Sequence, residues 1–281
     1  APAFGASFQQ LQWVLLAYLL ASTNLIVGAG RLGDLIGRRR LLLAGISLFS
    51  LASVLCGLAP TLGFLVAARA LQGLGAAIMM VLAMALVGEA LPKAHAGRAM
   101  GLLGSMSALG TALGPTLGGL LIAGFGWPAI FVVNLPLGLL ALGLVQRYLP
   151  ADHRKPSVGG PRFDLLGTLL LALTLAAYAL AMTLGRGPFD PLNAALLAAA
   201  ALGAGLFVRI EARAAAPLIR LAMLARDRAL TRSLAMTALV STVMMATLVV
   251  GPFYLAQPAF GLDAVRVGLL MSVGPVVAAL A

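Results

Sequence analysis

Apolar runs of about 20 residues recur along the chain and limit what it can fold into, because a helix of that length crosses a bilayer. Of the 281 residues, 62% are hydrophobic and only 10% are charged. That is more apolar surface than a soluble domain can bury. The sequence therefore predicts an all-α polytopic membrane protein with eight complete spans and a truncated ninth. We expect these spans at 11–30, 41–59, 64–88, 99–123, 129–149, 165–184, 192–210 and 233–256, and from 267 to the end.

The basic residues predict an orientation and a partner. A net charge of +11 is also typical of nucleic-acid-binding proteins, but the Lys and Arg residues lie between the apolar runs. Alternate loops hold 16 of the 19, and the opposite loops hold only Arg186 and Arg266. Short loops rich in Lys and Arg stay in the cytoplasm. We therefore expect residue 1 on the outer side, the lipid bilayer as the partner, and no nucleic acid.

Few residues indicate a metal, disulfide or enzyme site. Cys56 is the single cysteine, so an intrachain disulfide is impossible. His95 and His153 have no companions at metal-ligand spacing, and we expect no metal site. The sequence contains neither H-E-x-x-H nor G-x-S-x-G, which argues against an intramembrane enzyme.

Most of the charge in the first sixty residues lies between Gly30 and Arg40. The spacing predicts a short cytoplasmic turn, with Gly30 ending the first helix in a left-handed conformation and Gly33 and Gly37 allowing a tight reversal. Asp34 could pair with the neighbouring arginines or face a helix N-terminus. On these grounds alone the stretch is a positive-inside turn.

The same turn resembles the G-x-L-x-D-x-x-G-R-R loop between the second and third helices of major facilitator superfamily transporters. The matching residues are Gly30, Leu32, Asp34, Gly37, Arg38 and Arg39. The resemblance implies a loop that takes part in conformational switching, with Gly30, Asp34, Gly37, Arg38 and Arg39 as its residues.

Arg69 is the one charge placed well inside a predicted span. It should either face the interior of the helix bundle or extend to the outer headgroups, and burial arguments alone leave both open. Gln72 and Gly73 share its helix face. The segment resembles the R-x-x-Q-G-x-G-A-A pattern in the fourth helix of the superfamily's drug exporters. That resemblance assigns Arg69, Gln72 and Gly73 to a proton-coupling network and favours the interior.

Glycines recur every fourth residue at Gly110, Gly114 and Gly118. They form a flat stripe on which another helix could pack closely, and Pro115 should bend the helix there. The string through Gly119 also resembles the fifth-helix antiporter motif, G-x-x-x-G-P-x-x-G-G. That motif is associated with exporters and not with proton symporters.

A third string, from Trp127 to Gly138, resembles one found in drug:proton antiporters with fourteen spans, and two extra spans follow it. The resemblance covers helices two to ten of fourteen, so we expect the first and the last four helices to be absent from this chain. The expected parts are an N-terminal bundle (1–149), a cytoplasmic loop (150–164), two inserted linker helices (165–210), a basic connector (211–232) and the start of a C-terminal bundle (233–281).

The implied function is multidrug efflux: proton-coupled antiport of amphipathic, often cationic molecules across the cytoplasmic (inner) membrane. The protein would be a monomer without cofactors, driven by the proton gradient. The alternative is uptake or symport of a small metabolite. A channel or a purely structural role would leave the motifs unexplained. All eight acidic residues fall in loops or at span ends, so we expect that this chain by itself cannot couple transport to protons.

Overall fold

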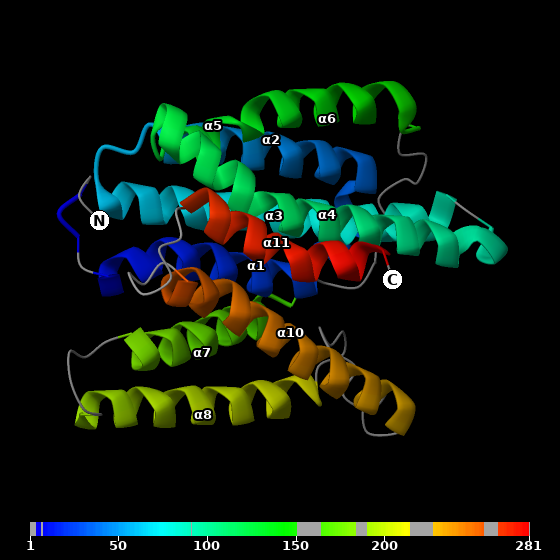
Figure 1. The fold of residues 1–281 in the computed structure, drawn as a ribbon. Helices are drawn as coiled ribbons and strands as arrows, with labels where there is room; N and C mark the ends of the chain where they lie inside the picture. The colour runs from blue at the N-terminus through cyan, green and yellow to red at the C-terminus, as the bar shows by residue number, and fades with distance from the viewer. Residues whose placement is uncertain are drawn as a thin grey trace. The chain divides into compact units, whose positions relative to one another are not determined.

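A computed structural model describes residues 4–6, 8–90, 92–150, 164–183, 190–213, 227–255 and 264–280. Every regular element in these ranges is an α-helix (Figure 1), which confirms the predicted all-α fold. The helices are α1 (Phe8–Ile36), α2 (Arg38–Gly57), α3 (Leu62–Ala90), α4 (Lys93–Phe125), α5 (Ala129–Val132), α6 (Asn134–Tyr148), α7 (Leu165–Thr183), α8 (Pro191–Glu211), α10 (Arg228–Leu255) and α11 (Ala264–Leu280).

The number of candidate spans agrees with the prediction. In the described residues, six helical stretches are long and apolar enough to cross a membrane, and the number rises to eight if two bent helices each count as one span. One bent helix is α1, which turns by 58° between Gln10–Ile26 and Gly28–Ile36. The other is α4, which turns by 41° between Gly97–Thr111 and Thr116–Phe125. The second break contains Pro115, where a bend is predicted.

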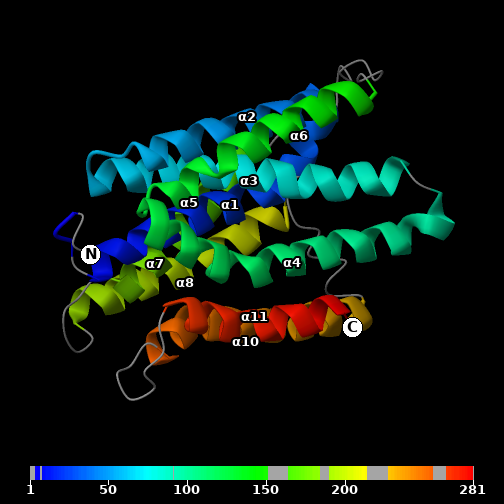
Figure 2. The ribbon, with the colours of Figure 1, turned by 45° about the horizontal axis from the view of Figure 1, so that its top comes forward.

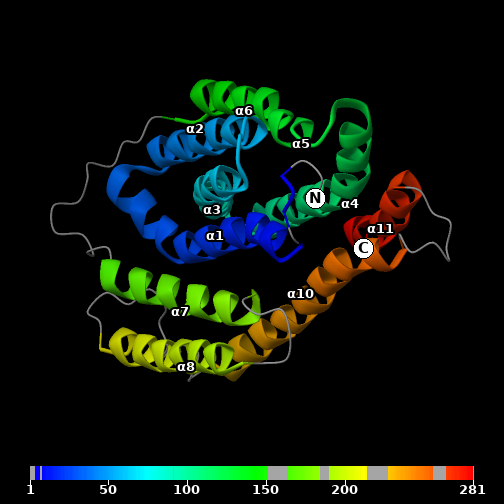
Figure 3. The ribbon, with the colours of Figure 1, turned by 90° about the vertical axis from the view of Figure 1, so that its left-hand side faces the viewer.

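The helices form two compact units. Unit 1 combines Ala1–Leu86 with Phe131–Ala222, and unit 2 combines Val87–Ile130 with Met223–Ala281. In unit 1, α6 packs on α2, α1 packs on both α2 and α7, and α7 pairs with α8 (Figure 3). In unit 2, α11 packs along α4 and also contacts α10, beside which it lies in Figure 2. The domain boundaries predicted from the sequence stay a prediction.

The apolar core of unit 1 lies between α2 and α3. Its buried side chains are Leu41, Leu42, Ile46, Ile78 and Leu82. Lipid tails are as apolar as these side chains, so helix association in a membrane depends on close packing more than on removal of apolar surface from water. Small residues allow that packing: a Cβ atom at Gly45 would lie 2.5 Å from Cγ2 of Ile78.

The first turn differs from the prediction. Helix α1 does not end at Gly30 but continues through Gly33 and Asp34 to Ile36, and the left-handed residue is Gly37, with φ of 104°. Gly33 serves packing instead of chain reversal, because a Cβ atom there would come within 2.7 Å of Cδ2 of Leu82 on α3. The predicted turn is therefore a break of one residue between two helices.

Helices α7 and α8 pack side by side, each is capped at its start, and one polar contact joins them. Asp164 accepts a hydrogen bond from the Gly167 amide at 2.8 Å and so caps the start of α7. Asp190 caps α8 by accepting bonds from the amides of Leu192 and Asn193. The Asn193 side chain in turn donates to the Ala181 carbonyl at 2.6 Å. This bond ties the start of α8 to the end of α7.

Candidate functional site

Arg69 is the centre of a polar cluster inside unit 1. Its Nε donates to the Val14 carbonyl of α1 at 3.0 Å, and its Nη1 donates to Oε1 of Gln72 at 2.6 Å. The guanidinium lies 4.4 Å from the Tyr18 ring centroid and 5.7 Å from that of Phe131, both within cation–π range. Arg69 therefore faces the helix bundle, and the alternative in which it extends to the headgroups is wrong.

Gln72 links Arg69 to a second helix. Its Nε2 donates to Oγ of Ser53 on α2 at 2.7 Å, and the Ser53 hydroxyl donates to the Phe49 carbonyl at 2.7 Å. Gln72 is 1% exposed and Ser53 is fully buried. A buried polar group must find partners inside the protein, because the hydrocarbon region of a membrane offers no water. The chain of bonds from Arg69 through Gln72 to Ser53 meets this requirement and connects α1, α2 and α3.

Two glycines beside this cluster let the helices approach closely enough for these bonds to form. A Cβ atom at Gly73 would collide with the backbone carbonyl of Tyr18, where α3 crosses α1. A Cβ atom at Gly75 would lie 2.7 Å from the Phe49 amide nitrogen and 2.9 Å from the Gly45 carbonyl oxygen, where α3 crosses α2. The spacing R-x-x-Q-G-x-G thus places two polar anchors next to two helix crossings.

The partners of the Arg69 guanidinium are neutral groups. Within the described residues, the partners of its hydrogen bonds and ring contacts are a carbonyl, an amide and two aromatic faces. The acidic residues in the described ranges are in the last turn of a helix or beside its first residue, as predicted: Asp34, Glu89, Asp164, Asp190, Glu211 and Asp227. The cluster therefore presents a net positive charge inside the bundle.

The predicted switch loop forms a second polar cluster at one end of unit 1. Asp34 pairs with Arg38 at 2.9 Å. Of the two roles considered for this carboxylate, the structure thus shows pairing with a neighbouring arginine. Arg38 also donates to the Ala85 carbonyl of α3 at 3.5 Å, and Arg39 donates to the Gln146 carbonyl of α6 at 2.9 Å. Gln146 lies in the last turn of α6, where a cation is favoured, and Ala85 lies five residues before the end of α3. The arginines thus tie the start of α2 to the ends of three helices.

The glycine stripe of α4 has different surroundings. No heavy atom of a described neighbour lies within 4 Å of a Cβ built at Gly110, Gly114 or Gly118. The stripe is uncovered in the described part of the chain, so the packed seam expected there is not observed. Gly119, the last residue of the predicted antiporter motif, lies on the same helix. The role of these residues as an antiporter motif stays a prediction.

Across the described ranges, no three His, Cys, Asp or Glu side chains are close enough to hold a metal ion.

Comparison with known families decides the class of the protein. A match to the Major Facilitator Superfamily covers residues 1–281. The chain belongs to this superfamily. The resemblance that the motifs indicate is thereby confirmed, and the chain is placed among transporters and not among enzymes.

Relatives within the superfamily include proteins named for multidrug resistance and multidrug transport. The chain is 41% identical over 223 residues to the multidrug resistance protein Stp of Mycobacterium tuberculosis, a match over 78% of this chain and 41% of that protein. It is 30% identical over 265 residues to the multidrug transporter protein MdtP of Bacillus subtilis, covering 93% of this chain and 48% of MdtP. It is also 36% identical over 182 residues to the riboflavin transporter RibZ of Clostridioides difficile, covering 64% of this chain and 39% of RibZ. The chain thus spans less than half the length of these relatives.

Of the three predicted residue groups, the structure gives two of them contacts with neighbouring helices of unit 1: the group around Arg69 and the switch loop around Asp34. The third group, the glycine stripe of α4, has none among the described residues. Sequence reasoning missed Val14, Tyr18, Ser53 and Phe131 around Arg69, and also the carbonyls that bind Arg38 and Arg39. Ser53 carried a usable signal, since small polar residues in spanning helices often bond to a neighbouring helix. The backbone carbonyls carried none, because any residue has one.

Proposed function

We propose that the protein to which this chain belongs is a proton-coupled antiporter that exports amphipathic, often cationic molecules across the cytoplasmic membrane. The observation that supports this most is the cluster of the half-buried Arg69 with the buried Gln72 and Ser53 inside spanning helices. Charged residues at membrane depth are costly and usually functional. The name of Stp, a multidrug resistance protein, supports export as the direction, and the name of MdtP, a multidrug transporter protein, supports drugs as the substrates.

The chemistry of the cluster fits a role in coupling. Arg69 stays protonated at any accessible pH, so it cannot carry the proton itself. Its charge would attract a carboxylate and repel a bound cation, and the protonation state of that carboxylate would then decide whether the cation can bind. Gln72 and Ser53 hold the guanidinium in place. No cofactor is required, because the proton gradient supplies the energy.

The second cluster fits a role in conformational switching. Transporters of this kind expose a central site to each side in turn by moving helical bundles as rigid bodies. The bonds from Arg38 to Asp34 and Ala85, and from Arg39 to Gln146, join helix ends within unit 1, so that these helices would move together. The exposed Asp34 pair is weak enough to break and re-form. We place this end in the cytoplasm and residue 1 outside, in a monomeric transporter.

A second candidate is proton-coupled uptake of a small metabolite. The similarity to the riboflavin transporter RibZ favours it, since that relative matches at an identity between those of Stp and MdtP. The glycine pattern of α4 counts against it, because the motif that it resembles belongs to exporters.

Everted membrane vesicles distinguish the two candidates. The vesicles come from cells that express the reading frame containing residues 1–281, and their lumen is acidified. An exporter accumulates ethidium in the lumen while a pH-sensitive dye reports proton release. A riboflavin symporter instead releases preloaded riboflavin together with protons. Ethidium accumulation that survives collapse of the pH gradient would contradict proton coupling, and riboflavin release without ethidium uptake would favour the second candidate.

A further inference from the structure

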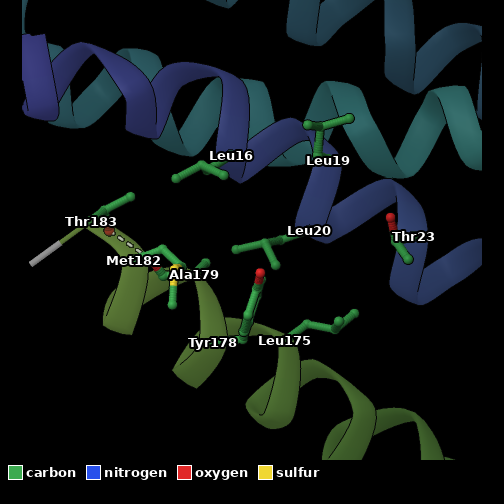
Figure 4. Close-up of a pocket in the computed structure, with 9 residues that line it drawn as sticks. All are labelled: Leu16, Leu19, Leu20, Thr23, Leu175, Tyr178, Ala179, Met182 and Thr183. Atoms are coloured by element: carbon green, nitrogen blue, oxygen red, sulfur yellow. Dashed lines mark hydrogen bonds between the residues drawn. The ribbon is translucent and has the colours of Figure 1, made fainter. Parts of the chain in front are cut away.

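An apolar pocket lies between α1 and α7 within unit 1 (Figure 4). Its volume is about 180 Å³, and it is open on one side. The α1 side is formed by Leu16, Leu19, Leu20 and Thr23, and the α7 side by Leu175, Tyr178, Ala179, Met182 and Thr183. Neither polar cluster described above contributes a residue to it.

The lining of the pocket selects an uncharged occupant. None of its nine residues is ionised at neutral pH, and the lining consists mainly of aliphatic side chains. A cation placed there would lose its hydration without gaining a counterion, which is costly. The Thr183 hydroxyl already donates to the Ala179 carbonyl at 2.7 Å, so it adds little polarity. The charged part of a cationic drug is therefore excluded, and a hydrocarbon segment is favoured.

The size and the location of the pocket fit such a segment. An apolar cavity of about 150 Å³ is large enough to hold benzene, so the pocket can take a short stretch of alkyl chain. Tyr178 and Met182 remain 54% and 48% exposed, so the open side is reached from outside the helix pair. In Figure 4 the Tyr178 ring extends from α7 toward α1. Helix α7 qualifies as a membrane span, so lipid chains surround it.

We propose that this pocket is a binding site for one acyl chain of a membrane phospholipid, which fills the gap between the α7–α8 hairpin and α1. The inference does not depend on the direction of transport or on the substrate. The chain would be held by close contacts with both helices, since packing and not removal from water favours association within a membrane. The bound chain would then form part of the contact through which α7 packs on α1.

Photo-crosslinking tests this assignment. The full chain is reconstituted in nanodiscs with phosphatidylcholine that carries a diazirine in the middle of one acyl chain, and labelled peptides are mapped by mass spectrometry. Labelling should concentrate on 16–23 and 175–183. Met182→Trp fills the open side and should lower labelling of these peptides about tenfold. Leu173→Trp is the matched control, because Leu173 lies on the same helix, is 59% exposed and does not line the pocket.

The remaining outcomes overturn the proposal. Uniform labelling along α1 and α7, unchanged by Met182→Trp, would mean ordinary contact with bulk lipid. Loss of labelling on addition of excess tetraphenylphosphonium would mean that the pocket binds an amphipathic cation instead.

Ala179→Leu fills the inner end of the pocket and gives a second test if Met182→Trp does not fold. A wild-type thermal unfolding temperature in detergent verifies the fold of each variant.

Discussion

Helices α3 and α4 are both rich in glycine, but their glycines have opposite surroundings. On α3, Gly73 and Gly75 are pressed against the backbones of α1 and α2. On α4, a Cβ atom added at Gly114, within the stripe, would meet no described heavy atom within 4 Å. Glycine spacing thus permits close helix packing without specifying where it occurs.

The polar residues on the two helices account for the difference. On α3, Arg69 bonds to α1, and Gln72 bonds to α2. On α4, the hydroxyls of Ser105 and Thr111 donate to carbonyls four residues earlier in the same helix. A bond to another helix holds that helix as a neighbour, whereas a bond within the same helix does not. The comparison indicates that the glycines packed against a neighbouring helix are those that lie beside cross-helix polar bonds.

The largest expected effect is that of a side chain at the α3 crossing. Gly73→Ala places a Cβ atom against the Tyr18 carbonyl, and the helices must separate or shift. Overpacking of this kind costs about 1–3 kcal/mol. The free energy of unfolding in mixed micelles should fall by that amount. Gly114→Ala is the control and should change it little, because the added methyl group meets open space. Equal losses of unfolding free energy in Gly73→Ala and Gly114→Ala would show that the two glycines do not differ in packing as described.

Removal of the Gln72 amide should have the next largest effect. Gln72→Leu leaves Arg69 without one acceptor and Ser53 without its donor. Hydrogen bonds between spanning helices contribute on average about 0.6 kcal/mol and at most about 1.7 kcal/mol, so a loss near 1 kcal/mol is expected. The control is Gln146→Leu, since the exposed Gln146 contributes only its backbone carbonyl to the described contacts. A double-mutant cycle with Ser53→Ala should show coupling, and additive effects would exclude the bond as a stabilising contact.

Loss of the Asp34 charge should affect stability only slightly. The Asp34 side chain is 57% exposed, and exposed ion pairs contribute about 0.2–1 kcal/mol. Asp34→Asn should therefore insert and fold normally but slow the transport cycle, because the switch loop loses its ion pair with Arg38. Efflux of a fluorescent cation at matched expression measures this. Wild-type efflux from Asp34→Asn cells would contradict the proposed role in switching.

The smallest effect on stability is expected for a bulky residue on the α4 stripe. Gly114→Leu should change the free energy of unfolding of the chain by less than about 0.5 kcal/mol, as surface substitutions usually do. It should nevertheless block transport or open a proton leak if the stripe packs closely during the cycle. Normal proton-coupled transport by Gly114→Leu would remove the argument for a close-packed seam.

The all-α class of the fold could be predicted from the sequence, because apolar run length is a property of single segments. The cost of a buried charge left two positions open for Arg69, and only the resemblance to drug exporters favoured the interior. The end of α1 could not be predicted. Glycine at Gly30 and Gly33 is compatible with a turn and with a packed helix. The side chains of α3 that lie against them, Val81 and Leu82, are about fifty residues away in the sequence. Ser53 and the rings of Tyr18 and Phe131 depend on the same kind of distant contact.

The most direct test of the account compares two arginines in one assay. Substrate-evoked proton release is measured in everted vesicles for the wild type, Arg69→Ala and Arg147→Ala at equal membrane levels. Arg69 lies inside the polar cluster, whereas Arg147 is exposed and its guanidinium contacts the Tyr148 ring. The account predicts that Arg69→Ala abolishes proton release and that Arg147→Ala retains it. Proton release by Arg69→Ala at the wild-type rate would contradict the proposal that this cluster couples transport to protons.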